Sequence, residues 1–107
     1  MTAFDSRERA LEAIFVHDEE MKFCAYARRN KLLGLWAAEK LGKAGDAADA
    51  YAKAVVMSDF EEEGDHDVFR KIRGDFDHAG VAETDHDIRR TMDELLARAV
   101  EQLSAER

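Results

Sequence analysis

With 107 residues, 46% of them hydrophobic, the chain has the size of one small domain with a modest core. Its formal net charge of −8 argues against nucleic-acid binding, which requires a clustered basic surface. Its one cysteine excludes an internal disulfide framework, and no apolar run is long enough to span a membrane. Because acidic residues near the N-terminus do not fit a signal peptide, we expect a cytoplasmic protein without membrane insertion.

The charge is distributed unevenly along the chain. Residues 1–20 carry a net charge of −4, residues 21–43 carry +5, and residues 44–107 carry −9. We therefore expect the basic stretch to face an acidic surface, which includes the C-terminal half of this same chain.

The first 41 residues favour helix but fall into two pieces. An apolar stripe of Phe4, Leu11, Ile14 and Phe15 marks a segment of residues 3–17, which the polar run 17–20 interrupts. A first core helix is then expected over residues 19–41, ending at Gly42. A second glycine, Gly34, lies inside this helix and predicts close packing against a neighbouring helix.

Three more amphipathic helices follow. The second is expected to start at Asp46 as N-cap and to reach residue 57 or 60. The third follows Asp65 as its N-cap and stops by Gly80, and the last opens at Thr84 with acidic residues in its first turn.

Four such helices with short connections predict an all-α fold, an antiparallel four-helix bundle over residues 19–107. The best core candidates are Trp36, Phe69, Phe76 and Leu95. Residues 1–18 are left over, so we expect the bundle to fold while this N-terminal segment, mobile or helical, keeps its stripe for a partner.

Three groups of histidine and aspartate suggest a metal site at first sight: 65–67, 77–78 and 85–87. Two of them fall at helix N-termini, where acids cap backbone amides, and adjacent helical residues point in different directions. We therefore expect no metal and no other cofactor. Cys24 lacks a histidine at helical spacing and is expected to be a small core residue rather than a nucleophile.

No glycine-rich phosphate loop occurs in the sequence. A shallow nucleotide contact by Arg28, Arg29 and Lys31 remains an alternative, although basic residues on an exposed helix face are usually only solvated.

Three sequence blocks resemble the zeta subunit, an inhibitor of the F-type ATP synthase in alphaproteobacteria. They are FDSRERALEAIFVHDEE over residues 4–20, ARRNKLLGLWAAEKLG over residues 27–42, and SDFEEEGDHDVFRKIRGDF over residues 58–76. The middle block is the most specific, and the likeness covers nearly the whole chain.

The resemblance implies a non-enzymatic protein, a monomer when free, that associates with the membrane-bound ATP synthase. It implies that the N-terminal segment inserts at a catalytic interface between the alpha and beta subunits, near the gamma subunit, and blocks ATP hydrolysis much more than synthesis. The residues expected to bind this partner are Phe4, Asp5, Arg7, Glu8, Leu11, Ile14, Phe15 and Asp18. Two alternatives stay open: a small helical nucleotide-sensing domain, and an ATP synthase assembly factor without inhibitory activity.

Overall fold

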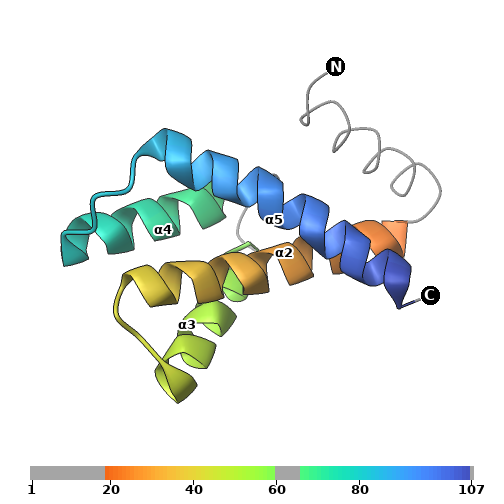
Figure 1. The fold of residues 1–107 in the computed structure, drawn as a ribbon, viewed down its shortest axis with the longest axis horizontal. Helices are drawn as coiled ribbons and strands as arrows, with labels where there is room; N and C mark the ends of the chain where they lie inside the picture. The colour runs from red at the N-terminus through yellow and green to blue at the C-terminus, as the bar shows by residue number, and fades with distance from the viewer. Residues whose placement is uncertain (1–18, 60–65, 107) are drawn as a thin grey trace.

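A computed structural model describes residues 19–59 and 66–106 as four α-helices. They are α2 (Glu19–Lys40), α3 (Gly45–Ser58), α4 (His66–Ala79) and α5 (Asp85–Ala105), shown in Figure 1. These described residues contain no strand, so the predicted all-α four-helix bundle is confirmed. None of the described helices is long and apolar enough to cross a membrane.

Helices α2 and α5 form a long antiparallel pair to which the two shorter helices are added. The pair has 22 and 21 residues, whereas α3 and α4 have 14 each. Helix α2 packs against α3 and α5, and α4 packs against the same two neighbours. At 1.5 Å per residue α2 is about 33 Å long and α3 about 21 Å. The start of α2 and the end of α5 therefore extend past the other two helices (Figure 1).

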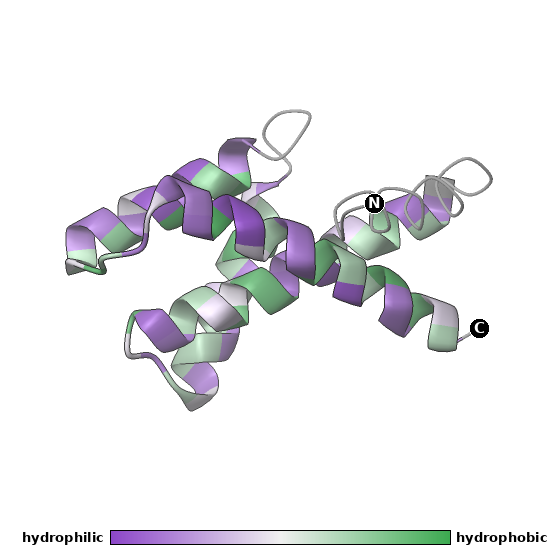
Figure 2. Ribbon diagram, turned by 45° about the horizontal axis from the view of Figure 1, so that its top comes forward, coloured by the Kyte–Doolittle hydropathy of each residue, from purple (hydrophilic) through white to green (hydrophobic). Residues whose placement is uncertain are grey.

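The main core draws buried side chains from all four helices, including Leu33, Val55, Ile72, Phe76 and Met92. Figure 2 shows hydrophobic residues gathered where the helices cross, with hydrophilic residues on the outer faces. A smaller cluster of Ala25, Leu96 and Val100 joins the projecting parts of α2 and α5. The core therefore continues along the long pair beyond the ends of the short helices.

Only one of the four predicted core residues is fully buried. Phe76 has no exposed surface, whereas Trp36, Phe69 and Leu95 are partly buried and pack around the main core. The ring centroids of Trp36 and Phe76 lie 5.6 Å apart at a tilt of 60°, a favourable aromatic arrangement. Three of the four large residues therefore lie at the edges of the core, and Phe76 fills its centre together with aliphatic residues.

The close packing predicted at Gly34 is confirmed. A Cβ atom placed on Gly34 would lie 2.6 Å from the Ala52 Cα and 3.1 Å from its Cβ. The backbones of α2 and α3 therefore approach each other at a point where only glycine fits.

The predicted N-cap residue is confirmed for α5 but not for α3. Thr84 caps α5 as expected, in a reciprocal capping box with Asp87. The prediction of Asp46 as N-cap is wrong, because α3 begins one residue earlier and Asp46 lies inside its first turn. There a carboxylate still stabilises the positive end of the helix dipole. Asp65, the predicted cap of α4, lies outside the described residues.

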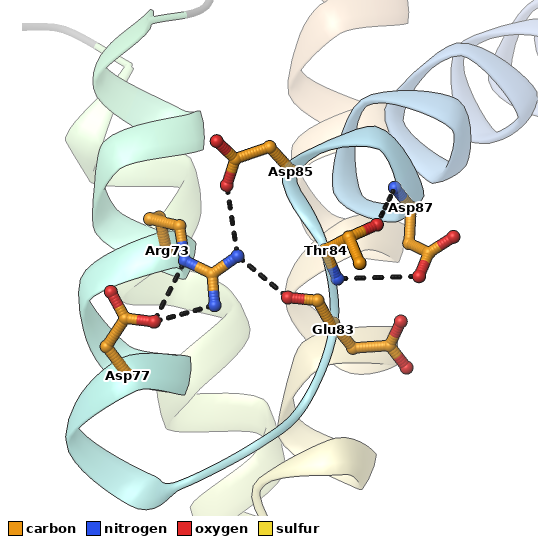
Figure 3. A network of polar contacts seen from close by, with 6 residues as sticks. All are labelled: Arg73, Asp77, Glu83, Thr84, Asp85 and Asp87. Atoms are coloured by element: carbon orange, nitrogen blue, oxygen red, sulfur yellow. Dashed lines mark hydrogen bonds and ion pairs between the residues drawn. The ribbon is translucent and has the colours of Figure 1, made fainter.

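A polar network fixes the turn from α4 to α5 (Figure 3). Arg73 donates hydrogen bonds to Asp77 at 2.7 and 3.0 Å, to the Glu83 carbonyl at 2.7 Å and to Asp85 at 3.1 Å. The hydrogen bond to Asp77, followed by the one to Asp85, raises the pKa of Arg73 above its ordinary value. This one side chain ties the end of α4 to the start of α5.

The predicted attraction between the basic stretch and the acidic C-terminal half is also confirmed. Arg28 of α2 pairs with Glu106, which follows α5, at 2.5 Å, and Lys40 pairs with Glu83 at 3.3 Å. The middle and the C-terminal end of α2 are thus linked by charge to later parts of the chain.

Candidate functional site

The residues predicted from sequence to bind a partner all belong to the N-terminal segment. Phe4, Asp5, Arg7, Glu8, Leu11, Ile14, Phe15 and Asp18 lie outside the described residues. The surface that the structure does describe next to them is the first half of α2, which begins at Glu19.

The first half of α2 exposes an unusual apolar side chain. Met21, Ala25, Arg29 and Leu33 recur every four residues and are all buried, so they define the inward face. Phe23 lies off this face and is 61% exposed. Met57, near the end of α3, is 64% exposed, and in residues 19–59 and 66–106 these two are the large hydrophobic side chains most open to solvent.

Phe23 forms one wall of a shallow groove between α2 and the end of α3. Tyr26, Ala27 and Asn30 continue the α2 wall, and Val56 and Asp59 form the α3 wall. Met57 follows Val56 directly in the chain. The groove is small and largely apolar, with polar groups at one end.

A buried polar chain fixes this polar end. Arg29 Nε donates to Asn30 Oδ1 at 2.7 Å, and Asn30 Nδ2 donates to Asp59 Oδ2 at 2.9 Å. The Arg29 guanidinium also lies 5.3 Å from the centroid of the Tyr26 ring. Arg29 and Asn30 are 2% and 1% exposed. The network therefore binds α2 to the residue that follows α3 and keeps the two groove walls in register.

The three predicted nucleotide-contacting residues do not share a surface. The expectation that Arg29 is solvated is wrong, because its side chain is buried in the network described above. Arg28 instead turns toward Glu106, and the hydrogen bond between them raises the pKa of Arg28 and lowers that of Glu106. Only Lys31 is exposed. The structure brings no cluster of these three cations together.

The structure also shows where Cys24 and three of the histidines lie. The prediction of Cys24 as a core residue is wrong: the thiol is exposed, because position 24 falls outside the four-residue repeat that faces inward. His66 lies beside Arg89, with Nδ1 3.3 Å from the guanidinium, and His78 and His86 are exposed. Within the described part of the chain no group of three or more His, Cys, Asp or Glu side chains could hold a metal ion.

Sequence reasoning missed the groove, although a signal was present. Once the period of Met21, Ala25, Arg29 and Leu33 is recognised, Phe23 stands out as an aromatic residue on the outer face. The period was hard to recognise because it includes Arg29, and an arginine is rarely expected on a buried face.

The fold and the groove together define a small helical bundle with a shallow apolar groove between two of its helices. The sequence matches the family model described as ATPase inhibitor subunit zeta over residues 1–102. The chain belongs to this family.

A solved structure supports the fold independently. A protein structure determined by solution NMR is similar to this chain with a TM-score of 0.72 and 50% sequence identity. The alignment covers 81% of this chain and 99% of that chain. None of the curated proteins compared matches the sequence significantly.

Proposed function

We propose that this protein inhibits ATP hydrolysis by the F-type ATP synthase. The observation that carries the proposal is the extent of the family match, which runs from residue 1 to residue 102. It includes the N-terminal segment as well as the four helices, so the likeness to an ATPase inhibitor subunit is not confined to the bundle.

In the proposed mechanism the N-terminal segment and the four-helix bundle have different roles. Residues 1–18 insert at a catalytic interface between the alpha and beta subunits, near the gamma subunit, and the bundle holds them there. Packing of the described residues supports this division, since their buried side chains run from Met21 to Val100 and form a main core and a smaller cluster within the four helices. The apolar stripe Phe4, Leu11, Ile14 and Phe15 precedes that core and supplies anchors for a groove on the enzyme.

An inhibitor of this kind must bind and also release. If the segment orders on the enzyme, part of the contact energy offsets the loss of chain entropy, and affinity stays moderate despite a large contact surface. The acidic and basic side chains Asp5, Arg7, Glu8 and Asp18 then set the register of insertion through ion pairs.

The test is ATP hydrolysis by an alphaproteobacterial F-type ATP synthase titrated with the full chain. A variant with Phe4, Leu11 and Phe15 replaced by serine should lose inhibition, because its apolar anchors are gone. The control is Asp93→Ala, an exposed position on α5 away from the groove, which should inhibit as the parent does. Circular dichroism should show the same helical content in all three proteins.

The proposal would be refuted if the parent chain left the rate of ATP hydrolysis unchanged. Binding to the enzyme without any effect on turnover would instead identify an assembly factor. The nucleotide-sensing alternative gains no support from the geometry, because Arg28 is paired with Glu106 at the surface, Arg29 is buried, and Lys31 alone of the three is fully exposed.

A further inference from the structure

We infer that an outer face shared by α2 and α3 binds an acidic segment of the ATP synthase that also exposes an apolar side chain. This α2–α3 face consists of six residues, which are Phe23, Ala27 and Lys31 on α2 and Lys53, Val56 and Met57 on α3. The inference rests on the proposed function, because it takes the enzyme as the partner. It adds a second contact to the one proposed for residues 1–18.

Apolar side chains provide the first observation. Phe23 and Met57 are the two large hydrophobic residues most open to solvent in the part of the chain that the structure describes, and they come from different helices. They are grouped at one place, because Phe23 lines the same groove as Val56, and Met57 directly follows Val56 in the chain. Apolar side chains grouped in this way, rather than scattered singly, are typical of an interaction surface.

Two lysines of the α2–α3 face have no carboxylate partner among the described residues. Lys31 follows Ala27 by one helical turn, Lys53 precedes Met57 by one turn, and both lysines are exposed. Neither forms an ion pair, a hydrogen bond or a ring contact with another residue of 19–59 or 66–106. Other basic side chains in these ranges do pair with carboxylates, namely Arg28, Lys40, Arg70, Lys71, Arg73 and Arg90. The two lysines are therefore available to a partner.

The charges favour an acidic partner over a second copy of this protein. Lys31 and Lys53 attract carboxylates at short range, and the acidic residue of the groove, Asp59, already accepts a hydrogen bond from Asn30 at 2.9 Å. Two copies in contact through this face about a two-fold axis would instead bring its lysines against each other. Each copy also carries a net charge of −8, so long-range repulsion opposes such a pair. The partner that fits is a different chain with acidic and apolar side chains.

The α2–α3 face begins close to the point where the N-terminal segment joins the bundle. Helix α2 starts at Glu19, and Phe23 is four residues, or about 6 Å, further along it. With residues 1–18 inserted in the enzyme, the first turns of α2 are the part of the four helices nearest the entrance. An enzyme segment that borders the entrance can therefore reach Phe23 and the lysines beyond it without displacing the inserted residues.

A contact through this face adds affinity because the two contacts belong to one chain. Once residues 1–18 are inserted, the face meets its site at an effective concentration in the millimolar range, as for two sites joined by a short linker. A contact too small to be stable alone therefore still slows dissociation of the inhibitor. The α2–α3 face should thus set the concentration needed for inhibition, whereas residues 1–18 decide whether inhibition occurs.

The first test measures half-maximal inhibition of ATP hydrolysis by the full chain and by its Lys31→Glu and Lys53→Glu variants, made singly. Each charge reversal should raise the half-maximal concentration by about 3- to 10-fold. The rise should shrink at high salt, because the screening length falls from about 10 Å at 0.1 M to about 3 Å at 1 M. The matched control is Arg98→Glu, an exposed α5 residue that likewise makes no ion pair within the described ranges, and it should change the value by less than about twofold. Lysine variants that inhibit as well as Arg98→Glu would overturn the inference.

The apolar part of the face is tested by the Phe23→Ser, Met57→Ser variant. Both side chains are exposed, so their replacement leaves the core unchanged, and circular dichroism should show the helical content of the parent. The half-maximal concentration should again rise by about 3- to 10-fold, and this rise should persist at high salt because apolar burial is not screened. An unchanged value would count against the inference.

A second experiment locates the contact without relying on inhibition. Cys24 is the one cysteine of the chain, is exposed, and is adjacent to Phe23, so a maleimide photocross-linker attached to it samples the surroundings of the face. With the purified ATP synthase, the cross-linked peptide should contain Asp or Glu together with an apolar residue, and its yield should fall with Lys31→Glu but not with Arg98→Glu. Inhibition without such a cross-link would overturn this inference and leave the proposed function standing. The cross-link without any effect on ATP hydrolysis would refute the proposed function and leave the contact standing.

Discussion

Replacing Gly34 by alanine provides a sharp test of how α2 and α3 are packed. The new Cβ would lie 2.6 Å from the Ala52 Cα, whereas carbon atoms in favourable contact are about 3.5–4.0 Å apart. The two helices must therefore separate locally by about 1 Å, and overpacking of this kind costs about 1–3 kcal/mol. Alanine regains up to about 1 kcal/mol of helix propensity. The net expectation is a loss of about 1–2 kcal/mol of unfolding free energy.

The same substitution at Gly74 is the matched control. This glycine also lies inside a helix, but it is exposed, and a Cβ placed there meets no atom within 4 Å. Gly74→Ala should therefore stabilise the protein by about 0.5–1 kcal/mol through backbone entropy alone. The assay is thermal and urea unfolding followed by circular dichroism.

The two variants should move the melting temperature in opposite directions. For a domain of this size the Gly34 variant should melt roughly 5–15 °C below the parent, and the Gly74 variant a few degrees above it. A Gly34→Ala protein that is as stable as Gly74→Ala would refute the close approach of α2 and α3.

Three further predictions concern the polar contacts. Thr84→Ala removes the cap of α5 and should cost about 1 kcal/mol in urea unfolding. The hydrogen bonds with Thr84 lower the pKa of Asp87 below its ordinary value of 3.8. The stability that these bonds add is therefore present above pH 3.8 and is lost as the pH falls below it. Asp87→Asn should make the unfolding free energy, measured at a series of acidic pH values, less dependent on pH. Burial, followed by the 2.7 Å hydrogen bond to Asp75, raises the pKa of Tyr51. The stability contributed by the protonated Tyr51 hydroxyl is therefore fully present below the ordinary pKa of tyrosine and is lost at higher pH. Tyr51→Phe should cost about 1 kcal/mol at neutral pH and should remove the late alkaline step in absorbance at 295 nm.

Hydrophobic periodicity and glycine positions were sufficient to predict most of the fold. The spacing of Val68, Phe69, Ile72 and Phe76 predicts the inner face of α4; Val68, Ile72 and Phe76 are fully buried, and Phe69 is partly buried. Gly42, with φ of +77°, follows α2 where a terminating glycine was expected. Such features depend on local backbone preference and on one repeating face, both of which a single sequence contains.

Features that depend on which helices become neighbours were harder to predict. Arginine is usually a surface residue. Arg29 is buried because it contacts Tyr26 and Asn30 beside it, and because Asn30 in turn binds Asp59, which is distant in the sequence. The contact of Arg73 with the turn before α5 likewise requires the angle between two helices. Trp36 is only partly buried because the bundle is too small to enclose so large a ring. The predicted binding residues of the N-terminal segment remain predictions, since they lie outside the described residues.

The contacts that stabilise the bundle also prepare its groove. Gly34 allows α2 and α3 to touch, and the chain from Arg29 through Asn30 to Asp59 fixes their relative position near the open end. The walls around Phe23 are therefore held by the same contacts that hold the two helices together. Substitutions that loosen the α2–α3 contact should therefore reduce stability and disturb the groove together, because both properties depend on the same two helices.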